Sequence, residues 1–417
     1  MQTRISEVTL ASPAGREAND ILRRCVHCGF CNATCPTFGL TGNELEGPRG
    51  RIYLVKALME GEEGSGTTLT HLDHCLGCRA CETTCPSGVE FHRLADIGRE
   101  VLHERGIRPA WDRWRRRFLS RFFDSSAWLR GAVAAGRSLR SFLPERVARV
   151  LPSGRKAAYP TLPAGSRQVL LQEGCVQPVV APEINAAAAR VLARRGVACR
   201  EASGCCGALA YHLDDLDRAR RQVRRNIDAW HPLLAQNEGL VITASGCAAF
   251  VGDYPAVCRG DARYEARARE LAERVVDLSE MLEPLARDPS LEEREQPALA
   301  LHVPCTLKHA LGGELRLRTL LRKSGLRIVD TADDGQCCGS AGAYSILHPG
   351  TSSALRQKKL DQFSTGNPDQ IVTANIGCRQ HLASGASVPV RHWIELWDDL
   401  ESAAGQDAMD HGTSGSR

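Results

Sequence analysis

Cysteines carry most of the chemistry that this sequence can perform. The spacing C-x2-C-x2-C-x3-C-P occurs twice, as CVHCGFCNATCP over residues 25–36 and as CLGCRACETTCP over residues 75–86. In a two-cluster ferredoxin, the first three thiolates of such a run bind one [4Fe–4S] cluster and the fourth binds the other. The spacing therefore predicts two [4Fe–4S] clusters with crossed ligands. Cluster 1 would use Cys25, Cys28, Cys31 and Cys85, and cluster 2 would use Cys75, Cys78, Cys81 and Cys35.

Zinc is the alternative metal, because paired C-x-x-C groups also form tetrahedral thiolate sites. A zinc site needs four ligands, whereas this pattern supplies two matching quartets, each followed by a proline. The pattern therefore favours iron–sulfur clusters over zinc.

A second cysteine pattern is duplicated further along the chain. Equivalent cysteines recur at intervals of 130, 132 and 131 residues, which indicates an internal repeat. The first copy holds Cys175, Cys205, Cys206 and Cys247, and the second holds Cys305, Cys337, Cys338 and Cys378. Each copy could hold a further [4Fe–4S] cluster by ligand count, and the alternative is a cluster of buried thiols that positions subunits.

The elements around these cysteines predict how they are positioned. In each copy an apolar strand precedes the first cysteine and another precedes the last, with helical stretches between them. We expect two α/β half-domains with cysteines on loops beyond strand ends, where open α/β sheets bind ligands. Near the N-terminus, Ile52, Val55 and Met59 have helical spacing, so the ferredoxin domain should be helical.

A basic, aromatic segment joins the two halves. Residues 108–149 contain eleven arginines and three acidic residues, and Trp111, Trp114, Phe118 and Phe122 fall on one helical face. Such a helix could lie on an anionic membrane surface near the quinone pool. Alternatively, it could dock against another domain or subunit and bury its aromatic residues there.

Composition sets the broad class. The formal net charge of +4 is too small to indicate nucleic-acid binding, and the sequence shows neither a secretory signal nor a long apolar run. We expect a cytoplasmic location, with possible peripheral contact to the inner face of the cell membrane. Eighteen cysteines in that reducing compartment indicate metal ligands rather than disulfides.

The order of motifs resembles a known family. Vicinal Cys-Cys-Gly repeats are typical of the heterodisulfide reductase B-type subunit and its relatives. A ferredoxin pair followed by two such repeats resembles, over nearly the full length, the iron–sulfur subunits of glycolate oxidase. The stretches that carry this resemblance include GPRGRIYLVK, NIDAW, TASGCAAFV and TANIGC.

The resemblance implies an electron-transfer subunit rather than a complete enzyme. In that family an FAD-binding partner oxidises glycolate to glyoxylate, and electrons pass to a quinone or another acceptor. Hydride removal needs a flavin or nicotinamide, and this chain has no G-x-G-x-x-G motif for either. We therefore assign no catalytic residue to it, expect FAD only on partner subunits, and expect no nucleic-acid partner.

Two positions depart from the heterodisulfide reductase pattern, which ends each complete repeat in C-x-x-C. Phe250 and His381 stand where that pattern has its last cysteine, so each copy keeps four cysteines. His381 is a candidate extra ligand. The remaining alternatives are a heterodisulfide-reductase-like subunit, an iron–sulfur subunit of another 2-hydroxy-acid or glycerol-3-phosphate dehydrogenase, and a non-enzymatic redox sensor.

The expected fold class is α+β and multi-domain, with a helical two-cluster ferredoxin domain followed by two duplicated α/β cysteine-rich half-domains. The expected divisions are 1–107 (ferredoxin-type domain), 108–166 (basic bridge and linker), 167–290 (first cysteine-rich domain), 291–402 (second cysteine-rich domain) and 403–417 (disordered tail).

Overall fold

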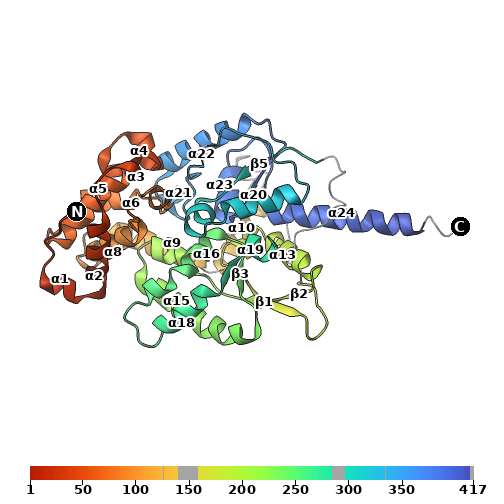
Figure 1. Cartoon of the computed structure of the whole chain (residues 1–417), viewed down its shortest axis with the longest axis horizontal. Helices are drawn as coiled ribbons and strands as arrows, with labels where there is room; N and C mark the ends of the chain where they lie inside the picture. The colour runs from red at the N-terminus through yellow and green to blue at the C-terminus, as the bar shows by residue number, and fades with distance from the viewer. Residues whose placement is uncertain (125, 140–157, 284–295, 334, 414–417) are drawn as a thin grey trace. The chain divides into compact units, whose positions relative to one another are not determined.

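The chain forms two compact units (Figure 1). The computed structural model describes residues 1–124, 126–139, 158–283, 296–333 and 335–413. Unit 1 consists of Met1–Arg121, Leu209–Ala219 and Gly335–Lys359, and unit 2 of Phe122–Ala208, Arg220–Asp334 and Leu360–Arg417. Unit 1 therefore takes in a short segment from each cysteine-rich repeat.

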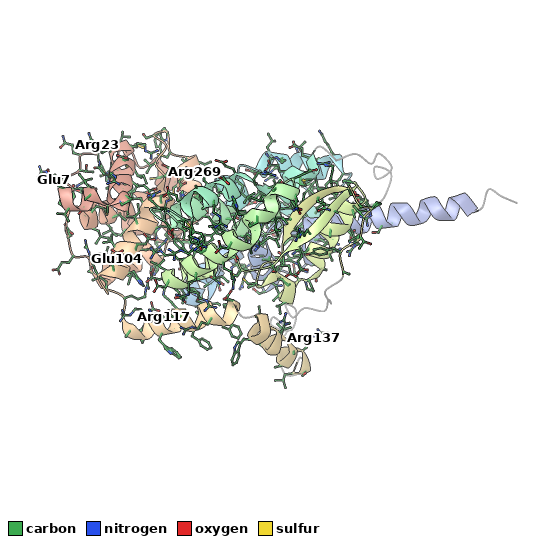
Figure 2. All side chains as sticks on the ribbon, turned by 90° about the horizontal axis from the view of Figure 1, so that it is seen from below. Glu7, Arg23, Glu104, Arg117, Arg137 and Arg269 are labelled. Atoms are coloured by element: carbon green, nitrogen blue, oxygen red, sulfur yellow. The ribbon has the colours of Figure 1, made fainter. Side chains whose placement is uncertain are left out.

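Unit 1 is helical throughout its described residues, as expected for the ferredoxin domain. Its helices are α1 (Glu7–Ala11), α2 (Pro13–Arg24), α3 (Phe30–Ala33), α4 (Pro36–Thr41), η1 (Glu44–Glu46), α5 (Pro48–Met59), α6 (Gly66–Asp73), α7 (Ala80–Thr83), α8 (Phe91–Glu104), most of α9 (Ala110–Asp124) and of α14 (Ala208–His212), α21 (Tyr344–Leu347) and most of α22 (Pro349–Ser364). Figure 2 labels Arg23 on α2 and Glu104 on α8, two helices that pack together.

The core of this unit comes from the apolar faces of α2, α5 and α8. Ile52, Val55 and Met59 are buried on α5, which confirms the helix predicted from their spacing. α2 begins at Pro13, where the Ser12 side chain accepts a hydrogen bond from the backbone N–H of Gly15.

Unit 2 contains two parallel sheets, as the duplicated strand pattern predicts. The first has the order β2 (Val197–Ala202), β1 (Arg167–Gln172), β3 (Leu240–Ile242), β4 (Val275–Asp277), and the second has the order β5 (Leu299–His302), β6 (Gln370–Thr373), β7 (Val390–His392). Every strand pair is parallel, and the central strands are buried. The α+β fold class with two α/β repeats is confirmed.

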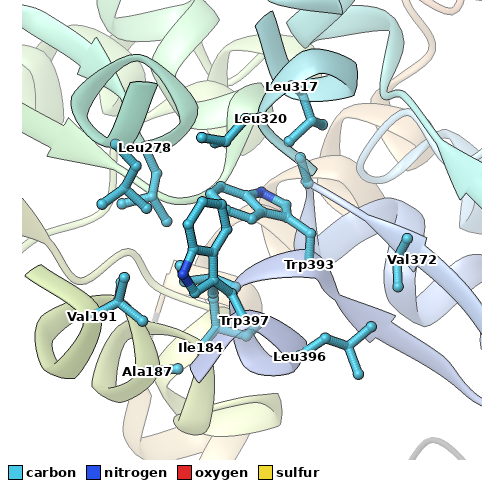
Figure 3. Packing of buried hydrophobic residues seen from close by; sticks show 14 of the residues in the cluster. Ile184, Ala187, Val191, Leu278, Leu317, Leu320, Val372, Trp393, Leu396 and Trp397 are labelled. Atoms are coloured by element: carbon cyan, nitrogen blue, oxygen red, sulfur yellow. The ribbon is translucent and has the colours of Figure 1, made fainter. Parts of the chain in front are cut away.

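Helices cover these sheets and share one large core. They are α10 (Ser126–Ser138), α12 (Gln177–Val180), α13 (Glu183–Ala193), most of α15 (Leu216–Trp230), η3 (His231–Gln236), α16 (Ser245–Gly252), α17 (Tyr254–Val257), α18 (Glu265–Glu273), α19 (Leu278–Leu282), the π-helix η6 (Thr306–Ala310), α20 (Glu314–Lys323), α23 (Ile376–Ala383) and α24 (Trp393–Thr413). Trp393 and Trp397 at the start of α24 lie among apolar residues of both repeats, including Ile184 of the first and Leu317 of the second (Figure 3). The two repeats therefore fold around a common core.

The C-terminal segment differs from expectation. We expected a disordered tail over 403–417, but α24 continues to Thr413 and residues 414–417 lie outside the described part. Three of the nine residues in the stretch ESAAGQDAM are alanine, the residue of highest helix propensity, and the stretch follows directly on an anchored helix. Residues 140–157 of the bridge and 284–290 of the first cysteine-rich domain also lie outside the described residues.

Candidate iron–sulfur sites

The two ferredoxin runs share one backbone path. Each leaves a helix, passes through a loop and enters a short helix, α3 or α7. The backbone is left-handed at His27 and Gly29 in the first run (φ 60° and 84°) and at Gly77 and Arg79 in the second (φ 65° and 60°). These are equivalent positions within C-x2-C-x2-C, so both loops reverse direction between the same pairs of cysteines.

The cysteines predicted for cluster 1 line one cavity. Cys25, Cys28 and Cys31 meet Cys85 of the second run there, and Cys81 also contributes to the wall. Burial, together with the nearby charges of Cys25 and Cys85, raises the pKa of Cys31 to about 11. A thiol of such high pKa loses its proton at neutral pH only when a metal takes the proton's place. This donor set fits a [4Fe–4S] cluster.

The cysteines predicted for cluster 2 also lie close together. Burial raises the pKa of Cys81 well above its ordinary value, and the charges of Cys78, Cys75 and Cys35 add to that rise. Cys35 comes from the first run, so the structure brings it next to the second run, as crossed ligation requires. Four thiols in a poorly solvated place fit a second cluster.

A network of polar groups contacts the Cys35 thiol. The Thr37 hydroxyl lies 3.3 Å from Cys35 Sγ and donates a hydrogen bond to the carbonyl oxygen of Glu46 at 2.7 Å. Arg51, which is 1% exposed, donates to Thr37 Oγ1 at 3.2 Å and pairs with Glu46 Oε2 at 2.8 Å. Arg51 lies in the stretch GPRGRIYLVK, whose structural role could not be inferred from sequence alone.

The second carboxylate oxygen of Glu46 joins two imidazoles to this network. Nδ1 of His71 and Nδ1 of His74 lie 2.7 Å and 2.8 Å from Glu46 Oε1. Burial alone would raise the pKa of Glu46, but hydrogen bonds with His74 and His71 and the charge of Arg51 bring it below its ordinary value. Glu46 is therefore an ionised, fully hydrogen-bonded support beside the predicted cluster 2.

The cysteines of the first repeat meet at the carboxyl ends of parallel strands. Cys175 follows β1, Cys205 and Cys206 follow β2, and Cys247 lies in α16 after β3. Cys175 Sγ and Cys205 Sγ are 3.1 Å apart, and Cys206 is hydrogen-bonded to both Cys205 and Cys247. The placement on loops beyond strand ends agrees with the expectation from sequence.

The thiols of this set change one another's pKa values. Hydrogen bonds with Cys175 and Cys206 hold the pKa of Cys205 well below its ordinary value. The same contacts, together with burial, raise the pKa values of Cys175 and Cys206. Buried thiols in mutual contact fit a metal cluster, which would take the place of their protons.

Two side chains fix the vicinal cysteine turn. Asn226 Nδ2 donates to the carbonyl oxygen of Cys205 at 2.7 Å, and the Tyr254 hydroxyl donates to that of Cys206 at 2.6 Å. The backbone at Gly204 has φ 126°, and a Cβ there would lie 2.8 Å from Asn226 Oδ1. Sequence reasoning missed these supports, although Asn226 opens the stretch NIDAW on which the resemblance partly rests.

Phe250 occupies the position of the fifth cysteine in the first repeat. Its ring is 3% exposed and makes an edge-to-face contact with Tyr254, with ring centroids 5.8 Å apart. An apolar ring packed in this way offers no ligand, so the first repeat presents four thiols.

The cysteines of the second repeat are divided between the units, and their grouping stays a prediction. Cys337 and Cys338 are buried in unit 1, whereas Cys305 and Cys378 belong to unit 2. Cys378 lies in the first turn of α23, and its Sγ is 3.4 Å from Nδ2 of Asn375, which precedes that helix. His381 is half-buried on the same helix.

Helix α9 of the basic bridge exposes its aromatic face and buries part of its charged face. Trp111, Trp114 and Phe118 are 64%, 70% and 54% exposed, whereas Asp112 and Arg116 are buried. The chain alone tests neither the membrane-surface nor the subunit-docking alternative, so both stay predictions. The face of the helix that is buried carries a network of ion pairs.

That network ties α9 to its own unit. Arg108 pairs with Asp73 at 2.6 Å, with Asp214 at 2.8 Å and with Asp112 at 2.9 Å. Arg116 pairs with Asp73 and Asp112 at 2.7 Å and 2.9 Å. Within the described ranges, no helix combines the length and apolar character that a membrane crossing requires.

Comparison with known proteins places these sites in context. Residues 21–89 match a family model described as a 4Fe-4S dicluster domain, and residues 169–252 and 299–383 each match a cysteine-rich domain. The chain is 47% identical to the glycolate oxidase iron-sulfur subunit of Escherichia coli, across 95% of this chain and 98% of that protein. It is 29% identical to the probable glycolate oxidase iron-sulfur subunit of Bacillus subtilis, across 92% and 94%. It is 24% identical to a fumarate reductase (CoM/CoB) subunit of Methanothermobacter marburgensis, across 95% and 76%.

Proposed function

Because the chain belongs to the family of glycolate oxidase iron–sulfur subunits, we propose that it carries electrons within a flavin-dependent complex that oxidises glycolate to glyoxylate. The observation that supports this proposal is that, in unit 1, the last cysteine of each ferredoxin run lies close to the first three cysteines of the other run. The FAD-binding partner subunits take hydride from glycolate, since this two-electron step needs a cofactor that accepts a pair of electrons. This chain then passes the electrons singly to a quinone or another acceptor.

The proposed ligands are those expected from the sequence. Cys25, Cys28, Cys31 and Cys85 would hold cluster 1, and Cys75, Cys78, Cys81 and Cys35 would hold cluster 2. The first repeat would hold a further cluster on Cys175, Cys205, Cys206 and Cys247, and the second on Cys305, Cys337, Cys338 and Cys378. Bound [4Fe–4S] clusters supply one-electron redox chemistry.

The chain's own residues hold these sites in shape. Thr37 and Arg51 fix the Cys35 thiol, and Asn226 and Tyr254 fix the turn that presents Cys205. The functional division proposed is a ferredoxin-type domain over 1–107, a bridge over 108–166, cysteine-rich domains over 167–290 and 291–402, and a terminal segment over 403–417.

A reductase of the heterodisulfide type is the competing function. It would use a cysteine at the end of each repeat, and Phe250 is a buried, packed ring at that position in the first. Electron relay to an acceptor therefore fits the first repeat better.

We also propose that the complex lies at the cytoplasmic face of the membrane, and that α9 contacts anionic lipid there. Its exposed aromatic residues Trp111, Trp114 and Phe118 alternate with the exposed arginines Arg113 and Arg117. Figure 2 labels Arg117 among side chains that project from this helix. Aromatic rings with cationic neighbours are typical of helices that lie in the membrane interface.

Vesicle flotation tests the membrane contact. Replacing Trp111, Trp114 and Phe118 with serine should release the intact complex from vesicles that contain phosphatidylglycerol. Unchanged flotation would exclude lipid contact, and loss of the flavoprotein from the complex would instead make α9 a subunit-docking helix.

The function itself is tested with Cys28→Ser in the assembled complex. Glycolate-dependent dye reduction should be lost while the flavoprotein stays bound, because cluster 1 would lose one ligand. Full activity in this variant, or in a complex that lacks the whole chain, would reject the relay.

A further inference from the structure

A cavity of about 590 Å³ adjoins the cysteines of the first repeat, in unit 2. Cys175 and Cys205 form part of its wall, together with Gly174 and Gly204. Its volume lies within the range of about 300–1,000 Å³ that is usual for small-molecule sites. Nothing in the proposed relay requires a cavity of this size here.

One helix, α10, lines one side of the cavity. Arg130, Val133, Ala134 and Arg137 recur at three- and four-residue intervals on α10, so they share one face of that helix, and all four line the cavity. Pro178, Val179 and Pro182 line it from the first repeat. The cavity thus has an apolar strip with guanidinium groups beside it.

Three arginines in the cavity wall are available to a ligand. Among the described residues, Arg130, Arg137 and Arg225 form no ion pair or side-chain hydrogen bond with a neighbour. All three are exposed, so the cavity is open to solvent. Asp124 and Glu173 also line the wall, so its formal charge is close to balanced.

These features favour a neutral ring with carbonyl oxygens over a simple anion. A balanced wall attracts a free anion weakly, whereas the apolar strip suits a flat ring and unpaired guanidinium groups donate well to carbonyl oxygens. Contact with Cys175 and Cys205 places such a ring beside sulfur atoms that would ligate a cluster.

We propose that this cavity is the site at which a quinone accepts electrons from the chain. The inference rests on the proposed relay, and it names the site at which electrons leave the chain. One quinone takes two electrons, one at a time, and two protons from solvent, and leaves as the quinol. The arginines stabilise the negative charge that appears on the carbonyl oxygens as each electron arrives.

The test uses the assembled complex and a benzoquinone with a single isoprene unit. The variants are Arg225→Gln, Arg130→Gln with Arg137→Gln, and Val133→Trp, which fills the cavity. Arg221→Gln is the matched control, because Arg221 is exposed on the same helix as Arg225 and does not line the cavity. Each complex is assayed for the Kd of the quinone by calorimetry, the KM for quinone, glycolate-dependent dye reduction and iron content.

The expected result is a rise in both the Kd and the KM for quinone of about tenfold in each arginine variant, since each loses charged donors to the ring. Quinone reduction should fall relative to dye reduction, and Arg221→Gln should match the unmodified complex. Val133→Trp should abolish quinone binding, and iron content shows whether it has folded.

An unchanged Kd and KM in both arginine variants would overturn the inference, as would binding of inorganic phosphate but not quinone in the cavity. A complex that binds quinone here yet shows no glycolate-dependent dye reduction would instead contradict the proposed relay. The two failures are therefore distinguishable.

Discussion

Single residues decide the backbone of the ferredoxin loops. Gly29 and Gly77 are the glycines at the left-handed positions, where an L side chain is strained, while His27 and Arg79 adopt the same conformation without being glycine. Each loop thus carries one glycine and one strained residue. The cysteine spacing predicted the ligands. It did not predict that the glycine stands at the second left-handed position in one loop and at the first in the other, because φ depends on the path of the folded loop.

Replacing Gly77 with alanine should destabilise the protein by about 1 kcal/mol, the usual cost of a left-handed alanine. The added Cβ meets nothing within 4 Å, so the effect isolates backbone strain. Gly29→Ala should cost about the same, because the atom that its Cβ would meet at 2.5 Å, Arg49 Nη1, is the end of a flexible side chain that can move aside. Urea unfolding measures both, with Gly39→Ala in helix α4 as control. Equal stability of all three variants would contradict the assignment of strain.

The Tyr254 hydroxyl is one of the two side-chain supports of the vicinal cysteine turn. Tyr254→Phe should lower the free energy of unfolding by about 1–3 kcal/mol, because the buried carbonyl oxygen of Cys206 and Asn226 Nδ2 both lose a partner. Urea unfolding and iron content measured together check this. Unaltered stability and iron content in Tyr254→Phe would show that the turn holds without this support.

At the scale of helices, α9 shows where sequence patterns fail. Its aromatic spacing predicted an amphipathic helix correctly but not which face is buried. Asp112 and Arg116 are buried because Asp73 and Arg108 lie opposite them, and such long-range ion pairs leave no periodic signal in the sequence. Composition likewise did not predict that α24 continues to Thr413.

Removing one carboxylate from this network should loosen α9. Asp112→Ala leaves Arg108 and Arg116 each short of a buried partner and should cost about 3 kcal/mol. Hydrogen exchange in α9 should quicken, with the exposed Arg113→Ala as a control that changes neither quantity. Protection equal to that of the unmodified chain would show that the ion pairs do not anchor the helix.

Burial of His392 between a strand and a helix should make unit 2 less stable in acid. Burial lowers the pKa of His392 to about 3, with Arg379 adding to the effect, so the folded ring stays neutral. Below pH 6.5 the unfolded chain binds a proton that the folded chain excludes, so the free energy of unfolding decreases as the pH is lowered. From pH 7 to 5 the loss should be about 2 kcal/mol.

His392→Gln should remove that part of the slope. Its side-chain amide nitrogen has the reach of His392 Nε2, which contacts the carbonyl oxygen of Thr243 at 3.1 Å, and can still donate to that oxygen. Urea unfolding at several pH values compares the two chains. Parallel pH profiles would mean that His392 does not account for the acid sensitivity.

At the scale of the whole molecule, the duplication predicted two parallel sheets, and both are present. The sequence did not predict that a segment after the vicinal cysteines of the first repeat, and a segment that contains those of the second, belong to unit 1. There Asp214 pairs with Arg108, and the Tyr344 hydroxyl lies 3.3 Å from the carbonyl oxygen of His74. Such contacts link residues more than 100 positions apart, which periodicity cannot show.

Electron paramagnetic resonance of the assembled complex tests the central claim most directly. Adding glycolate without an acceptor, under anaerobic conditions, should produce signals of reduced [4Fe–4S] clusters in this chain, with at least about eight iron atoms bound per copy. The Cys28→Ser complex should show a diminished or altered signal with its flavin still reduced. Full iron content with no cluster signal, while glycolate reduces the flavin, would contradict the account.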